Sequence, residues 1–135
     1  MFMLDTNICI YLINHRDGVL RERFEANAAR ICISSITYAE LCYGVAHSAR
    51  TAANARELEA FRLDLDILPF DPDAAAHYGE IRHALATSGQ PIGANDLLIA
   101  AHARSAKATL VTNNAREFER VPKLRVENWM RRLGG

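Results

Sequence analysis

Short hydrophobic runs alternate along the chain with longer stretches in which hydrophobic residues recur at helical spacing. The runs predict strands at residues 2–4, 31–33, 67–70 and 109–111, with a weaker one at 124–126. Helices are expected in the intervals, and no linker, repeat or low-complexity tract interrupts the alternation. Strands that alternate with helices usually pair in parallel, so the pattern predicts an α/β fold around a mostly parallel sheet.

Two helices are marked most clearly. The first should begin at Asp71 and Pro72, a capping residue followed by proline in the first helical position, and should end at Ser88 and Gly89. Its hydrophobic face is formed by Ala74, Tyr78, Ile81 and Leu85. The second, over residues 97–106, is hydrophobic on nearly all sides. We therefore expect it to be largely buried against the sheet.

Composition limits the classes of protein that fit. The 135 residues are half hydrophobic, which suits one buried core and a single domain over residues 1–135. Sixteen basic and sixteen acidic residues cancel, so no overall positive field attracts the chain to nucleic acid or to an anionic membrane. Asp5 and Asn7 interrupt the apolar start, and no basic leader precedes it. We expect neither a signal peptide nor a membrane span, and hence a cytoplasmic protein.

The cysteines and histidines show no metal-binding spacing. Cys9, Cys32 and Cys42 form no CxxC pair, and buried, reduced thiols are the expected reading. The five histidines are scattered without a ligand spacing such as HxxxH. A zinc site built from histidine or cysteine is therefore not expected.

Asp5 directly follows the first predicted strand. In open α/β sheets, ligands usually bind beyond the carboxyl ends of the strands, which makes this aspartate a candidate functional residue. Aspartate is also a common helix cap, and Asp5 would cap a helix that starts at Thr6 or Asn7. Taken alone, the position slightly favours the cap.

Glu40 lies in the otherwise apolar segment ISSITYAELCYGV, which predicts a strand, a serine turn and then a helix. One interpretation is a capping box, in which Thr37 caps the helix and Glu40 reaches back to it. The other is a glutamate that enters a crevice, because its neighbours are small or apolar. The segment by itself does not decide between the two.

Asp96 opens the helix of NDLLIAAHA, where an acid in the first turn would also complement the helix dipole. Asp5, Glu40 and Asp96 nevertheless all fall at strand ends or helix starts, which meet at one edge of a parallel sheet. Two carboxylates about 4 Å apart repel each other by roughly 4 kcal/mol at an effective dielectric of about 20. Oxygen ligands of this kind suit Mg²⁺ or Mn²⁺, and such a site favours phosphoryl chemistry.

Four motifs, MLDTNICI, ISSITYAELCYG, PIGANDLLIAAHAR and LVTNNAREF, together resemble the PIN-domain VapC toxins of bacterial toxin–antitoxin pairs. Their order and spacing match over nearly the whole chain. The resemblance implies an α/β/α sandwich with a mostly parallel sheet of four to five strands. It also implies a metal-dependent endoribonuclease that uses Mg²⁺ or Mn²⁺.

The resemblance assigns roles to individual residues. Asp5, Glu40 and Asp96 match the family's catalytic acids, with Asp5 and Asp96 as metal ligands, and Thr112 matches a supporting hydroxyl. Many relatives carry a fourth acid two residues beyond that threonine, where this chain has Asn114. This difference puts a second metal ion in doubt, and Glu117 is a candidate to compensate for it.

The resemblance also implies partners: a homodimer, a VapB-like antitoxin whose tail covers the site, and operator DNA bound only through the antitoxin. The form MLDTNICI with VTNNAREFERV is especially similar to the enteric type, which cleaves initiator tRNA in the anticodon loop. Exposed arginines near the crevice would contact the RNA, and the candidates are Arg50, Arg82, Arg104 and Arg116.

Other classes fit less well. A phosphatase of the haloacid dehalogenase type needs a second aspartate two residues after the first, where this chain has Asn7. A receiver-type signalling domain needs paired acids after the first strand and a lysine after the last, and neither is evident. A non-catalytic PIN module that only binds partners would be expected if the acids were lost, but all three are present.

Overall fold

The computed structural model describes residues 1–130, and in it five strands form one sheet in the order β3–β2–β1–β4–β5. Each neighbouring pair of strands is parallel. The strands are β1 (Phe2–Leu4), β2 (Ile31–Ser34), β3 (Asp66–Leu68), β4 (Thr109–Val111) and β5 (Val126–Glu127). The predicted parallel α/β fold is confirmed, with five strands.

Two strands are displaced from their predicted positions. β3 ends before Pro69, which has no backbone N–H to donate, and the N–H of Phe70 donates instead to Ser35 Oγ at 3.0 Å. β5 starts at Val126 rather than at residue 124, because only Val126 and Glu127 pair with β4. The side chain of Leu124 packs against the core instead.

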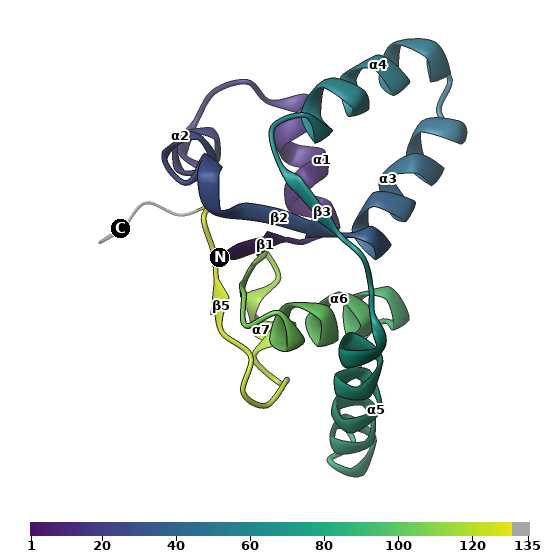
Figure 1. The fold of residues 1–135 in the computed structure, drawn as a ribbon, viewed down its shortest axis with the longest axis vertical. Helices are drawn as coiled ribbons and strands as arrows, with labels where there is room; N and C mark the ends of the chain where they lie inside the picture. Colours follow the sequence, from purple (N-terminus) through teal and green to yellow (C-terminus); the bar gives the residue numbers. More distant parts are fainter. Residues whose placement is uncertain (131–135) are drawn as a thin grey trace.

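Seven α-helices and one 3₁₀ turn, Ala28–Arg30, connect the strands within residues 1–130 (Figure 1). The α-helices are α1 (Thr6–Asn14), α2 (Val19–Ala26), α3 (Ser35–Ala46), α4 (Thr51–Arg62), α5 (Pro72–Thr87), α6 (Ala94–Ser105) and α7 (Ala115–Phe118). None of the helices described is both long and apolar enough to cross a membrane.

The helices form a layer on each face of the sheet. Met3 and Leu110 point from the central strands into a core shared with α5, α6 and α7. Their strand neighbours Leu4 and Val111 point into a second core, shared with α1, α2, α3 and α4. This alternation is the period-two geometry of a strand that is buried on both faces, and it produces the expected α/β/α sandwich.

Local signals set the ends of α5 as predicted. Asp71 Oδ1 accepts a hydrogen bond from the N–H of Ala74 at 2.9 Å, and Pro72 occupies the first helical position. The helix stops at Ser88, and Gly89 follows with φ of +69°, a conformation that glycine adopts without steric cost.

α6 begins at Ala94, three residues before the predicted start at residue 97. Gly93 precedes it as the capping residue, so Asp96 lies inside the first turn. The helix is buried along most of its length, as expected, with Ile99, Ala100 and Ala101 fully inaccessible. It therefore forms the inner helix of its layer and carries Asp96 close to the edge of the sheet.

The cysteine prediction is confirmed for two of the three thiols. Cys9 and Cys32 are buried, but Cys42 lies on the exposed side of α3 and is accessible.

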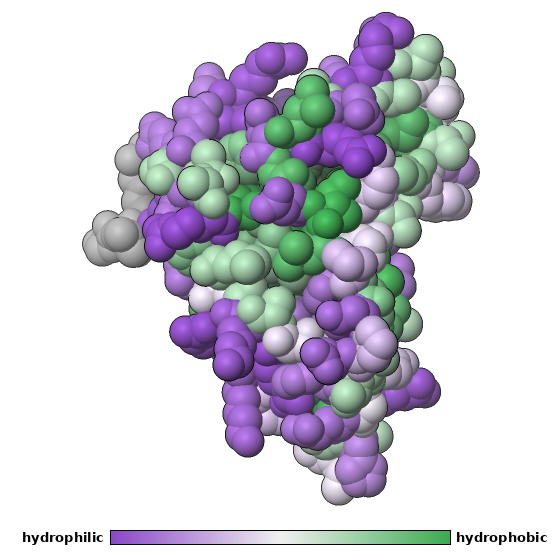
Figure 2. Space-filling model, in the orientation of Figure 1, coloured by the Kyte–Doolittle hydropathy of each residue, from purple (hydrophilic) through white to green (hydrophobic). Residues whose placement is uncertain are grey.

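Figure 2 shows the hydrophobic surface of the viewed face gathered near its centre, whereas the lower part, around α5, is largely hydrophilic. Leu63, just after α4, is the most exposed large hydrophobic residue in the described part of the chain, at 78%.

Candidate active site

The carboxyl ends of β1, β2 and β4 meet beside the first turns of α1, α3 and α6 (Figure 1). Asp5 directly follows β1 and is only 5% exposed. Its Oδ1 accepts a hydrogen bond from the N–H of Ile8 at 2.9 Å, so it does cap α1. The cap does not exclude the candidate functional role, because one carboxylate oxygen suffices for capping.

The capping-box interpretation of Glu40 is wrong. α3 starts at Ser35, and its cap is Ser34, whose Oγ accepts from the N–H of Ile36 at 3.1 Å. Glu40 therefore lies in the second turn of the helix. Its carboxylate accepts hydrogen bonds from the hydroxyl of Thr6 and from the side-chain amide of Asn95, the latter at 3.0 Å. Glu40 thus connects the starts of α1, α3 and α6, which supports the crevice interpretation.

The pKa of Asp96 indicates that the acids lie near one another. Partial burial, followed by the negative charges of Glu117, Asp5 and Glu40, raises its pKa to about 6. Neighbouring charges have this effect only across short distances. All four carboxylates therefore surround the same crevice.

Asp5 responds to the same surroundings. Burial raises its pKa, and the charge of Glu40 adds to this, while hydrogen bonds from the Thr112 hydroxyl and from the N–H of Ile8 oppose it. Thr112 is fully buried at the end of β4, and its Oγ1 also accepts from the N–H of Asn114 at 2.9 Å. Its side chain thereby connects Asp5 to the loop that follows β4.

Glu117 and Asn114 lie together beside Asp96. The side-chain amide of Asn114 donates to one carboxylate oxygen of Glu117. The other oxygen accepts from the N–H of Gly93 at 3.3 Å, just before α6. A hydrogen bond from a protonated Asp96 to the side chain of Glu117 also contributes to the raised pKa of Asp96. Sequence analysis assigned Glu117 only a supporting role, but its charge raises the pKa of Asp96 more than the charge of Asp5 or Glu40 does.

Sequence reasoning did not identify the neutral residues that hold the acids. Thr6 and Asn95 are the partners of Glu40, and Thr6 Oγ1 also lies 3.5 Å from the hydroxyl of buried Thr37. Both partners directly neighbour an identified acid in the motifs DTN and GAND. Polar residues adjacent to a candidate acid were therefore the available signal.

The donor chemistry of this crevice fits a hard divalent cation. Four carboxylates repel one another there, and no Lys or Arg among residues 1–130 forms an ion pair with any of them. A cation would relieve this repulsion, and carboxylate oxygens are the ligands that Mg²⁺ and Mn²⁺ prefer. In the described structure no three acidic, histidine or cysteine side chains are gathered closely enough to hold a metal ion. Glu40 and Glu117 instead accept hydrogen bonds from the side-chain amides of Asn95 and Asn114.

The arginines named as RNA contacts differ in their surroundings. Arg50, Arg82 and Arg116 are exposed, as that role requires. Arg104 is not available, since its side chain is 7% exposed and pairs with Glu80 at 2.9 Å. Its Nε also donates to His77 Nδ1 at 2.9 Å, so it joins α6 to α5 instead.

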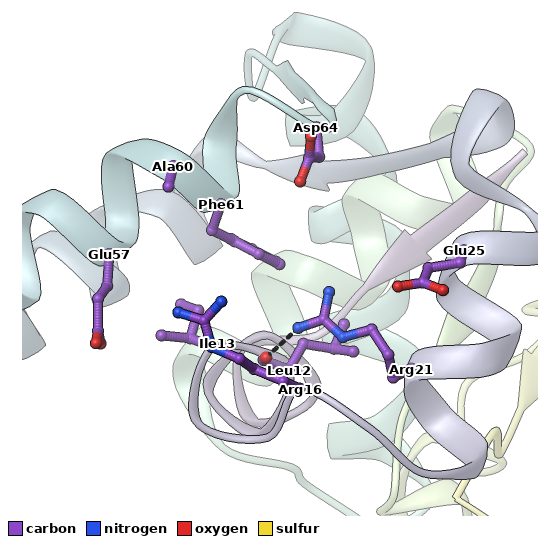
Figure 3. A pocket seen from close by; sticks show the side chains of 9 residues that line it. All are labelled: Leu12, Ile13, Arg16, Arg21, Glu25, Glu57, Ala60, Phe61 and Asp64. Atoms are coloured by element: carbon purple, nitrogen blue, oxygen red, sulfur yellow. Dashed lines mark hydrogen bonds between the residues drawn. The ribbon is translucent and has the colours of Figure 1, made fainter.

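A separate pocket of about 240 Å³ lies between α1, α2 and α4 (Figure 3). Both Arg16 and Arg21 line it, together with three acidic side chains, but none of the crevice acids does. Arg21 donates to the backbone carbonyls of Leu12 and His15, at the end of α1. Its role is to cap that helix end, and the pocket is distinct from the acidic crevice.

Comparisons with known proteins agree with this geometry. The family model described as PIN domain matches residues 2–124. The tRNA(fMet)-specific endonuclease VapC of Shigella flexneri is 49% identical, with 95% of this chain and 97% of that protein covered. The chain is 48% identical to the DNA-bound VapBC structure from Salmonella typhimurium, with a TM-score of 0.92 over 95% of this chain and 97% of that one. It is 45% identical to the structure of VapBC2 from Rickettsia felis bound to a promoter DNA fragment, with a TM-score of 0.90 over 95% of this chain and 98% of that one.

Proposed function

The chain belongs to the PIN-domain family, in its VapC branch, and we propose that it is a toxin that cleaves RNA by hydrolysis of a phosphodiester bond. The substrate that the relatives favour is initiator tRNA, because the similar proteins from Shigella and Salmonella are named for tRNA(fMet) cleavage. This places the chain among the endoribonucleases rather than among phosphatases of the haloacid dehalogenase type.

The observation that carries the proposal is the raised pKa of Asp96, together with its cause. Three carboxylates near a fourth, with no ion-paired Lys or Arg among residues 1–130 to neutralise them, oppose folding of this region. Such an arrangement is retained where a ligand compensates for it, and perturbed carboxyl groups in a crevice are typical of active sites. A structural role alone would not need four acids.

Asp5 and Asp96 are the proposed ligands for Mg²⁺ or Mn²⁺, and Glu117 is near enough to Asp96 to support the ion. A divalent ion of this kind, when bound, polarises the phosphodiester and makes a water molecule easier to deprotonate. Asn114 contributes a neutral amide where an acid would add charge, so a single ion is the expected stoichiometry.

The chain's own side chains position the reacting groups. Thr112 and the N–H of Ile8 fix the carboxylate of Asp5 at the end of β1. Thr6 and Asn95 hold that of Glu40, which is the acid proposed to take the proton released by the attacking water. The water oxygen forms a bond to phosphorus while the bond from phosphorus to the ribose 3′-oxygen breaks, and the 3′-oxygen takes up a proton from solvent to leave as a hydroxyl.

The partners follow from the same relatives. The similar solved structures contain VapBC pairs, in two cases bound to DNA. For this chain we infer a homodimer, inhibition by a VapB-like antitoxin, and contact with operator DNA only through that antitoxin. The place of action is then the cytoplasm, where tRNA is available.

The direct test is cleavage of initiator tRNA by purified protein in Mg²⁺ or Mn²⁺, compared with an elongator tRNA. Cleavage of the initiator at one site in the anticodon loop is expected, and none by the Asp5→Asn variant. The same variant, expressed without a partner at equal level, should no longer inhibit growth. A folded wild-type protein that cleaves no RNA would instead support the non-catalytic PIN module.

A further inference from the structure

A surface pocket of about 340 Å³ lies between α5 and the loop that leads into α6. Its volume falls within the range of small-molecule sites. Two core side chains, Leu85 and Leu97, contribute to it, and Pro91 and Ile92 add further apolar surface. The pocket is therefore mostly apolar.

Two side chains give this pocket an aromatic and a cationic element. The guanidinium of Arg82 lies 5.9 Å from the ring centroid of Tyr78, and its Nη1 donates to the tyrosine hydroxyl at 2.9 Å. Tyr78 is partly buried against the core, whereas Arg82 is exposed. The pair thus offers one planar ring, one planar cation and several free N–H donors.

The pocket and the acidic crevice share the loop that leads into α6 and the first turn of that helix. Ala94 and Leu97, which line it, flank Asp96 in the first turns of α6. Arg120 donates to the carbonyl of Pro91 at 3.4 Å, and Glu117 accepts from the N–H of Gly93 at 3.3 Å. The loop that forms one side of the pocket is therefore attached to the same segment that carries Glu117.

We propose that this pocket binds an unpaired nucleobase of the RNA, next to the phosphate that is cleaved. The inference rests on the proposed ribonuclease function and adds a subsite to it. A crevice of four carboxylates repels RNA phosphates, and the chain has no net positive charge, so affinity must come from local contacts. Unpaired bases stack on aromatic rings and on arginine guanidinium groups, and the donors of Arg82 suit the carbonyl oxygens of a base.

The chain contains a matched pair that serves as a control. Arg62 and Tyr38 form the same kind of contact, at 5.2 Å from guanidinium to ring centroid and 3.2 Å from Nη1 to hydroxyl. Neither residue lines this pocket. An effect of the Arg–Tyr contact on stability alone would therefore be produced by Arg62→Gln as well as by Arg82→Gln.

The experiment measures kcat and KM for three RNAs. One is an intact stem-loop, and the other two carry an abasic nucleotide on the 5′ or on the 3′ side of the cleaved bond. Tyr78→Leu and Arg82→Gln should each raise KM for the intact RNA about tenfold, the loss expected for one stacked base, with little change in kcat. For one of the two abasic RNAs, wild type and variants should have the same KM. Arg62→Gln should match wild type on all three RNAs, and thermal unfolding shows that each variant is folded.

Any of three outcomes would contradict the proposal that this pocket binds a nucleobase. KM could stay unchanged in both pocket variants, or it could rise equally for intact and abasic RNAs, which would indicate a contact with phosphate. Alternatively, Arg82→Gln could weaken self-association in sedimentation at unchanged KM, which would assign this face to a contact between subunits. In each case wild-type cleavage continues, whereas a wild-type protein without any cleavage would contradict the proposed function itself.

Discussion

At Asp96, partial burial and three neighbouring carboxylates raise the pKa to about 6, from 3.8 for an unperturbed aspartate. The folded state then binds this proton more tightly than the unfolded state, so the free energy of unfolding falls as the pH rises between these two values. Above about pH 6 Asp96 is ionised in the folded protein, and the decrease in the free energy of unfolding is complete. The charge that the proposed chemistry needs therefore destabilises the metal-free protein.

Asp96→Asn should consequently separate activity from stability. Removing the charge should lower RNA cleavage by at least about a hundredfold, because a metal ligand is lost. In chelator at pH 7.5 the variant should be more stable than wild type, by up to about 1 kcal/mol after solvent screening. Denaturant unfolding and cleavage assays on the same preparations provide both measurements. Unchanged cleavage would contradict the assignment of Asp96.

Asn114 lies where an acid would add a fifth charge to the crevice. Asn114→Asp should bind Mn²⁺ more tightly than wild type, since a carboxylate offers charge as well as oxygen ligands. Glu117→Gln should bind it more weakly, though with a smaller loss than Asp96→Asn. Calorimetric titration of Mn²⁺ into the four proteins tests this order. Weaker binding by Asn114→Asp than by wild type would show that residue 114 does not face the ion.

Between elements, a buried hydrogen bond joins the two helices that carry Glu40 and Asp96. His102 on α6 lies with its Nδ1 2.7 Å from Ser34 Oγ, and Ser34 is the cap of α3. His102 is 3% exposed, and its ring packs against Phe70 in a T-shaped arrangement with 5.5 Å between the ring centroids. Burial lowers the pKa of His102 from 6.5, although the charge of Asp71 partly opposes this.

This histidine should make the protein less stable in mild acid. His102 binds its proton less tightly in the folded protein than in the unfolded protein. The free energy of unfolding is therefore highest above about pH 6.5 and decreases as the pH falls below that value. The loss is at most about 1.4 kcal/mol per pH unit for one proton. His102→Asn should flatten the dependence between pH 7.5 and 5.

The comparison is best made with both proteins carrying Asp96→Asn, because Asp96 titrates in an overlapping range with the opposite sign. Denaturant unfolding at several pH values gives the two curves. Parallel curves would show that His102 does not titrate differently in the folded and unfolded protein.

For the molecule as a whole, the expected dependence on a divalent ion is the most general prediction. RNA cleavage should disappear in EDTA and return with Mg²⁺ or Mn²⁺, because no histidine or cysteine that could replace the ion is available at the crevice within the described residues. Cys9 lies near Asp5, but it is fully buried and its pKa is raised, so it stays a neutral thiol. Unimpaired cleavage in chelator would contradict the mechanism.

The chemistry of the product ends provides a second test at this scale. Hydrolysis by an activated water leaves a 5′-phosphate and a 3′-hydroxyl, whereas attack by the ribose 2′-hydroxyl leaves a 2′,3′-cyclic phosphate. End-group analysis of the cleaved RNA distinguishes the two. We expect the first result, because in the proposed mechanism the nucleophile is a water molecule whose proton Glu40 takes.

The sequence by itself determined the features that depend on near neighbours. Alternating hydrophobic runs fixed the parallel sheet and its two helical layers, because each face of a strand and of a helix must be covered. Asp5 and Asp71 were identified as caps because a cap bonds to an N–H only three residues away. The four motifs identified the family, since their residues are read in order along the chain.

Only the tertiary structure decided which groups meet. Glu40 bonds to Thr6 and Asn95, which are 34 and 55 residues away, and this excluded the local capping box that its own segment allowed. Arg104 was expected at the surface but is buried against Glu80, because α5 packs on α6. The pKa of Asp96 likewise depends on charges from other elements. The physical reason is that packing across the sheet selects partners by distance in space, which local pattern and spacing do not encode.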